Sequence, residues 1–78
     1  MTHEQYDFIV KAGFDILINY SYDKPERYVL SNQHTRVVLY NIENIILDKN
    51  ENISWIDFVK KDFSYRIYSD GETFVLNF

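Results

Sequence analysis

The two histidines, His3 and His34, are the side chains best suited to proton transfer or metal binding near neutral pH. The chain has no cysteine, so a standard zinc site and a thiol nucleophile are both missing. His3 falls in the first turn of an expected helix and His34 in an expected turn beside Thr35. Histidines in such places are ordinarily polar surface residues, and no G-x-S-x-G sequence supplies a serine nucleophile. We therefore expect no catalytic and no metal-binding residues.

The carboxylates and glycines show no chemical motif either. The acidic pairs Asp48/Glu51 and Asp70/Glu72 lack the alternating oxygen ligands and the central glycine of a calcium loop. The two glycines lie far apart, whereas a phosphate-binding loop clusters them. We expect solvated turns at both pairs, no cofactor, and a protein that is not an enzyme.

Length and composition indicate one small domain spanning residues 1–78. The net charge of −4 and a pI near 4.9 argue against nucleic acid and anionic membranes as partners. No apolar run reaches the roughly 18 residues of a membrane helix, and the first residues lack the positive cluster of a signal peptide. We expect a cytoplasmic protein. Residues with AT-rich codons are abundant, which suggests a low-GC bacterium or its phage.

The strongest helix signal lies at the start of the chain. Thr2 and Gln5 have the spacing of a capping box, and Gly13 is a natural helix stop. A helix is therefore predicted over about 3–12. A second helix is predicted from Ser54 through about Phe63, where Ile56, Val59 and Phe63 form an apolar stripe.

Strands are predicted between and after these helices. Alternating apolar residues indicate a strand over 14–22, followed by a turn over 23–26, and two more strands at 27–31 and 36–42. Residues 42–47 fit either a strand or a helix, with strand favoured by their β-branched content. A final hairpin of residues 64–69 and 72–78 is expected around a two-residue Asp70-Gly71 loop, which would place Ile67 opposite Phe74.

These elements predict an α+β fold in the order αβββαββ. An antiparallel sheet of about five strands would carry both helices packed on one face. Phe14, Ile16, Ile18, Tyr20, Tyr65, Ile67, Phe74, Leu76 and Phe78 would point toward the helices. The far face would be uncovered and would carry Leu17, Val29, Arg66, Tyr68 and Val75.

Aromatic residues are the most informative feature for function. Seven Tyr, six Phe and one Trp exceed what a core of this size needs, and exposed Tyr and Trp are favoured at protein interfaces. The candidate partner-binding residues are Leu17, Tyr22, Tyr28, Val29, Trp55, Arg66, Tyr68 and Val75.

The preferred hypothesis is a small non-catalytic protein-binding module. It would act as a phage- or mobile-element-encoded inhibitor that occludes a larger bacterial protein, in an anti-CRISPR-like role, with the acidic surface as a potential mimic of nucleic acid. One alternative is a structural homodimer through the far face, which Tyr68→Asp would convert to monomer. The other is a weak single-stranded nucleic-acid binder that stacks bases on aromatic rings beside Arg27, Arg36 and Arg66.

Overall fold

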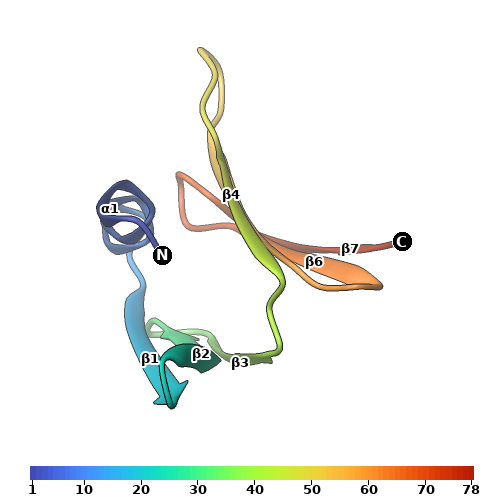
Figure 1. The fold of residues 1–78 in the computed structure, drawn as a ribbon. Coiled ribbons are helices and arrows are strands. Elements are labelled where there is room, and N and C mark those ends of the chain that lie inside the picture. Colours follow the sequence, from blue (N-terminus) through green and yellow to red (C-terminus); the bar gives the residue numbers. More distant parts are fainter.

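The computed structural model describes residues 1–78 and contains one helix and seven strands (Figure 1). The strands form two antiparallel sheets: sheet A in the order β1-β2-β3 and sheet B in the order β4-β5-β6-β7. The elements are α1 (His3–Lys11), β1 (Asp15–Ser21), β2 (Lys24–Ser31), β3 (Arg36–Tyr40), β4 (Asn44–Asp48), β5 (Trp55–Val59), β6 (Phe63–Tyr68) and β7 (Thr73–Asn77). None of them is a helix long and apolar enough to cross a membrane.

The helix α1 confirms the prediction for the start of the chain. Thr2 Oγ1 accepts a hydrogen bond from the Gln5 amide at 3.1 Å, and Gln5 Oε1 accepts one from the Thr2 amide at 2.9 Å. This reciprocal capping box satisfies two amides that the helix itself leaves free. Gly13 follows with φ of +93°, a conformation that glycine adopts without strain, and the chain turns into β1.

Sheet A follows the predicted strands, with one shift in the first turn. The chain reverses at Tyr22 and Asp23, where Tyr22 has φ of +56°, so the turn expected over 23–26 is placed too late. Pro25 lies within β2, opposite Tyr20, where the register shifts. Such an irregularity is one of the few places at which a sheet tolerates proline.

The second helix predicted from Ser54 is wrong, because this segment forms β5 and continues through a short turn into β6. The spacing of Ile56 and Val59 suggested one helix face, but in β5 these two residues point to opposite faces, and an apolar run this short does not separate helix from strand. In the structure, Ile56 and Phe58 point to the core as alternate residues of β5, which pairs with β4 and β6 on either side. Residues 42–47, which the sequence left open, supply most of β4.

The last hairpin forms as expected but its register differs by one residue. The Tyr68 amide donates to the Glu72 carbonyl and the Gly71 amide donates to the Tyr68 carbonyl, so the loop has three residues rather than two. A three-residue hairpin loop of this kind ends in a glycine that has positive φ and forms a β-bulge, and Gly71 has φ of +90°. Ile67 therefore pairs with Thr73, not Phe74. A slip of one residue moves Phe74 and Val75 to opposite faces from those predicted.

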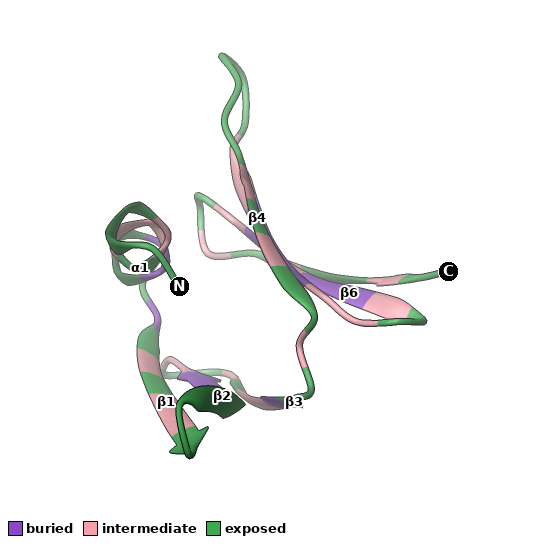
Figure 2. Cartoon of the chain, in the orientation of Figure 1, coloured by how far each residue is buried: buried purple, intermediate pink, exposed green.

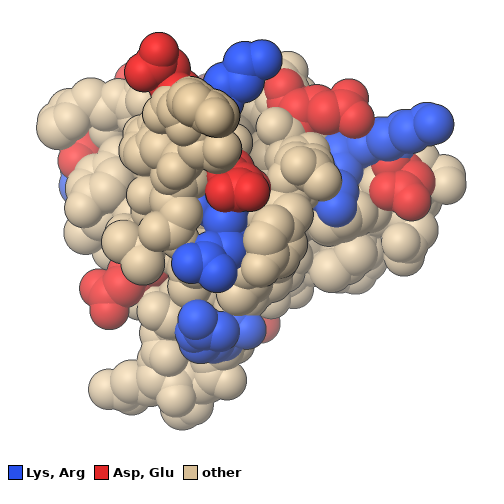
Figure 3. Space-filling model, turned by 60° about the horizontal axis from the view of Figure 1, so that its bottom comes forward, with Lys and Arg blue, Asp and Glu red and all other residues tan.

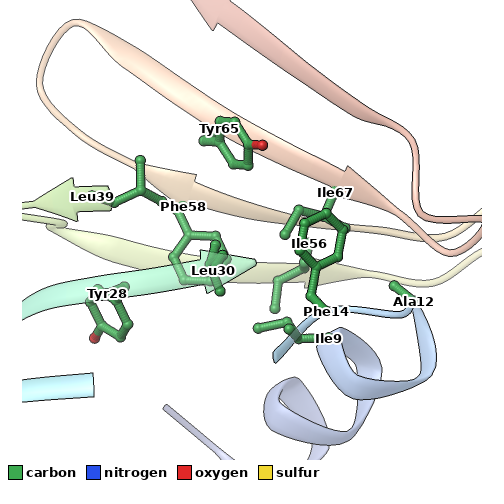
Figure 4. Close-up of a cluster of buried hydrophobic side chains, with 10 residues drawn as sticks. All are labelled: Ile9, Ala12, Phe14, Tyr28, Leu30, Leu39, Ile56, Phe58, Tyr65 and Ile67. Carbon is green, nitrogen blue, oxygen red and sulfur yellow. The ribbon is translucent and has the colours of Figure 1, made fainter. Parts of the chain in front are cut away.

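A single hydrophobic core joins α1 and the inner faces of both sheets (Figures 2 and 4). Its members come from all three parts of the fold: Ile9, Ala12, Phe14, Tyr28, Leu30, Leu39, Ile56, Phe58, Tyr65 and Ile67. The Tyr28 ring of sheet A contacts the Phe58 ring of sheet B edge to face, with ring centroids 5.5 Å apart. The Cα radius of gyration, 11.9 Å, is close to the roughly 11.5 Å expected for one domain of this length.

The expected fold class is thus wrong. The protein is mostly β, with one helix and seven strands in two sheets, rather than α+β with two helices on one five-stranded sheet. A chain with only one short helix has too little helical surface to cover a wide sheet. Its strands instead divide into two sheets that cover each other, together with α1.

Candidate functional site

The face of sheet B that points away from the core is the most distinctive surface of the molecule. Side chains alternate between the two faces of a strand, and Ile56, Phe58, Tyr65 and Ile67 all point inward. Their neighbours therefore point outward. We define the outer face of sheet B by these outward residues: Asn44, Ile46, Asp48, Trp55, Asp57, Val59, Ser64, Arg66, Tyr68, Glu72, Phe74 and Leu76.

An ion pair occupies the centre of this face. Asp57 of β5 and Arg66 of β6 are directly opposite one another in the register. Arg66 Nε lies 2.8 Å from Asp57 Oδ1 and Arg66 Nη2 lies 3.0 Å from Asp57 Oδ2, a bidentate arrangement. Only 21% of the Arg66 side chain and 12% of the Asp57 side chain are exposed. The hydrogen bonds to Asp57 raise the pKa of Arg66 above its usual range, although burial acts in the opposite direction.

Two aromatic rings flank the guanidinium group. Arg66 Cζ lies 4.4 Å from the centre of the Trp55 ring and 5.9 Å from the centre of the Tyr68 ring. The two rings also contact each other edge to face, with centroids 6.2 Å apart. Both separations from the guanidinium are within the range of cation–π attraction. The ion pair and the rings therefore form one preorganised cluster.

Exposed apolar groups surround the cluster. Ile46 of β4 lies opposite Asp57 and is 46% exposed, while Phe74 of β7 lies opposite Arg66 and is 54% exposed. Ser64 is buried on the same face, and its hydroxyl oxygen has no hydrogen-bond partner. Neither α1 nor sheet A lies over this face, because both pack against the other side of sheet B (Figure 1). The central charges of this face are paired with each other, and apolar groups surround them.

Of the candidate partner-binding residues, the structure brings three together: Trp55, Arg66 and Tyr68. Leu17 and Tyr22 are exposed but belong to sheet A and its first turn. The other three are Tyr28, Val29 and Val75.

Exposure was predicted wrongly for two of these three. Tyr28 and Val29 are 5% and 8% exposed, because β2 is the central strand of sheet A and is covered on both flanks. Val75 is half exposed, but it lies on the inner side of sheet B opposite Tyr65.

Sequence reasoning missed Ile46, Asp57 and Phe74 as members of the face. Asp57 was assigned to a helix, where it would not face Arg66. Phe74 was assigned to the core because the hairpin loop was taken as one residue too short. Ile46 lies in the segment whose period was ambiguous. The available signal for a strand was the short run Trp55–Val59, which is rich in aromatic and β-branched residues.

The two histidines line two separate hollows on the surface. His34 lines a hollow of about 400 Å³ with Asp70 and Glu72, beside the end of α1. His3 lines one of about 670 Å³ and forms an ion pair with Asp7 if protonated, at 3.4 Å. No group of three or more His, Asp or Glu side chains is placed to hold a metal ion.

Basic and acidic side chains are interspersed on the face of the molecule shown in Figure 3. Comparison of the chain with protein-family models, with curated proteins and with solved structures finds no match.

Proposed function

We propose that this protein is a non-catalytic binding module for another protein, with the outer face of sheet B as its interface. The observation that carries the proposal is the cluster of Trp55, Tyr68 and the Asp57–Arg66 pair, bordered by exposed Ile46 and Phe74. The aromatic and guanidinium groups of this cluster are the side chains most enriched among energetically dominant interface residues.

The paired charges support contact with a protein surface. Covering an isolated charge on binding is costly, since its hydration is lost. Arg66 already has both hydrogen bonds to Asp57 and a ring on its flank, so a partner would cover a group whose interactions are largely satisfied. The exposed apolar side chains of Ile46 and Phe74 add favourable free energy of binding when a partner removes them from water.

The same pairing disfavours the nucleic-acid alternative. A strand of nucleic acid needs free cations for its phosphates. Arg66 is engaged by Asp57, and Arg27 Nε donates to Asn19 Oδ1 at 2.8 Å, which leaves Arg36 as the arginine without a side-chain partner. Self-association through the outer face stays as the second alternative, and monomer formation by Tyr68→Asp remains its test.

The finer hypothesis is that the module acts in the cytoplasm as a phage- or bacterium-encoded inhibitor that occludes a larger protein, in an anti-CRISPR-like role. This part rests on the small size, the acidic charge and the AT-rich composition of the chain.

A matched pair of variants tests the interface. Ile46→Lys places a charge at the rim of the outer face, whereas Leu17→Lys places the same charge at a position of sheet A that is 57% exposed. Tagged wild type and both variants are incubated with nuclease-treated and untreated halves of a lysate of a low-GC bacterium, after circular dichroism has confirmed their folding. We expect one stoichiometric protein to be retained by the wild type and by Leu17→Lys, and lost by Ile46→Lys.

Capture of that protein equally by all three chains would contradict the proposed face. A species that disappears on nuclease treatment, or the absence of any stoichiometric protein, would contradict protein binding as the function in that lysate.

A further inference from the structure

We propose that strand β7 pairs with β7 of a second copy of this chain, in antiparallel orientation, and joins two copies of sheet B into one continuous sheet. This inference goes beyond the proposed function, since it concerns the edge of sheet B rather than the outer face. It starts from the fact that β7 is an edge strand, hydrogen-bonded only to β6.

The hydrogen-bond pattern shows which backbone groups of β7 remain free. The Tyr68 amide donates to the Glu72 carbonyl, and the Phe78 amide donates to the Asp62 carbonyl. Hydrogen-bonded residues of an antiparallel pair alternate, and the register between these two points is unbroken. The even-numbered residues of β7 therefore face β6. The N–H and C=O groups of Thr73, Val75 and Asn77 point outward from the sheet.

The other three edge strands carry protection that β7 lacks. In β4 both backbone groups of Ile45 are occupied: its amide donates to Asn44 Oδ1 at 2.9 Å, and its carbonyl accepts from Gln5 Nε2 at 3.0 Å. In sheet A, β1 is charged at Asp15 and has a register irregularity between Asn19 and Tyr20. The third edge strand, β3, begins with the charged residue Arg36. Charges, bulges and covering groups are the usual means of preventing edge pairing.

Strand β7 alone among the seven strands contains no charged residue, and it contains no proline or glycine. Its sequence is Thr-Phe-Val-Leu-Asn, and no side-chain hydrogen bond involves its backbone. Phe74 and Val75 are 54% and 47% exposed, so the strand presents apolar side chains as well as free backbone groups. A segment of this composition on a free edge favours strand addition.

The strand is also complementary to itself. Val75 is its central residue, and its backbone groups point outward. A twofold axis beside Val75 places this residue opposite Val75 of the second copy and Thr73 opposite Asn77. Each of these facing pairs exchanges two N–H···O bonds. The same axis places Phe74 against Leu76 of the second copy on the outer face, and Glu72 opposite Phe78, so no like charges meet. A second copy is therefore an occupant that fits the free donors, the free acceptors and the side chains together.

Amide hydrogen exchange of the full chain tests the pairing with an internal control. In a monomer, the Phe74 and Leu76 amides are protected by β6, while the Val75 and Asn77 amides exchange freely. We expect the Val75 and Asn77 amides to become at least about tenfold slower between low and high protein concentration, with little change at Phe74. Sedimentation over about 5 to 500 µM should show a dimer in the same range, because an edge contact well below roughly 1,200 Å² binds weakly.

Two variants separate the edge from the fold. Val75→Pro removes an amide that β6 does not use, so the β6–β7 ladder is kept, and proline is tolerated on an edge strand. Val75→Lys keeps the amide but opposes two charges across the axis. Both should be monomeric, whereas Leu17→Lys and Ile46→Lys should dimerise like the wild type. Should Val75→Pro fail to fold, Val75→Lys alone carries the comparison.

A wild type that stays monomeric over the whole range would overturn the proposal. So would a dimer that persists in Val75→Lys, or one whose Val75 amide exchanges as fast as in the monomer. Because Ile46→Lys spares β7, loss of dimer and loss of a foreign partner can be told apart.

Discussion

Each sheet carries an arginine whose Nε donates across to the neighbouring strand at 2.8 Å, yet the two surroundings differ. In sheet A, Arg27 donates to the amide oxygen of Asn19, directly opposite in the register. In sheet B, Arg66 donates to the carboxylate of Asp57, also directly opposite, and adds a second bond from Nη2. Trp55 and Tyr68 flank the second arginine.

The comparison shows how one backbone arrangement gives two kinds of surface. A neutral amide accepts one bond from an arginine and leaves the positive charge to water. A carboxylate neutralises the charge, and the guanidinium can then lie beneath aromatic rings. The outer face of sheet B therefore holds a partly buried cluster of paired charges and rings, while the matching position of sheet A has a neutral acceptor and no such rings.

The largest expected effect is that of breaking the pair in sheet B. Asp57→Ala leaves the Arg66 side chain, which is 21% exposed, without its acceptor and should lower the free energy of unfolding by about 3 kcal/mol. Asn19→Ala, the matched change in sheet A, removes one neutral acceptor and should cost about 1 kcal/mol. Urea unfolding followed by Trp55 fluorescence measures both. Equal costs in the two sheets would mean that the carboxylate and the rings add nothing to the arginine contact.

Substitution of the two glycines is expected to have an intermediate effect on stability. One glycine lies where α1 joins sheet A, and the other lies where sheet B contacts the end of α1. Gly13 links α1 to β1, and a Cβ there would meet nothing within 4 Å. Gly71 lies in the β6–β7 turn, where a Cβ would come within 2.9 Å of the Ala12 carbonyl oxygen. Gly13→Ala should lower the free energy of unfolding by about 1 kcal/mol because of its positive φ. Gly71→Ala should lower it by about 2 kcal/mol, because the close contact with the Ala12 carbonyl is added to the same backbone strain. Thermal unfolding of both variants tests this, and a larger loss at Gly13 would contradict the close contact between sheet B and the helix.

The smallest effect concerns the contact between the sheets. Burial, together with the neighbouring Tyr20, raises the pKa of Tyr28 in sheet A. The folded protein therefore keeps this proton at a pH where the unfolded chain loses it. The corresponding stability is fully present below about pH 10, the ordinary tyrosine pKa, and is lost as the pH rises through the raised value. The urea midpoint of Tyr28→Phe should fall less than that of the wild type between pH 8 and pH 11. An equal fall in both proteins would show that the Tyr28 phenol does not ionise at a higher pH in the folded state.

Local chemistry alone determined the start of the chain and most of sheet A. The capping box of Thr2 and Gln5, the stop at Gly13 and the alternation from Phe14 onward each need only neighbouring residues, and each is present in the structure. The existence of the last hairpin was also predictable from Asp70-Gly71. The candidate site was predictable only in part, as Trp55, Arg66 and Tyr68 were singled out for their type and not for their mutual contact.

Tertiary structure decided the rest. Residues 55–63 fit helix and strand alike, and pairing with β4 and β6 selected the strand, because Ile56 and Phe58 then reach a core shared with sheet A and α1. The turn at Gly71 set the register of β7, and with it the face on which Phe74 lies. The Asp57–Arg66 pair follows from the pairing of β5 with β6, which places these two residues directly opposite each other. The sequence determined which side chains were present, but their distribution between core and surface depended on strand pairing, because a change of one residue in register reverses every side chain of a strand.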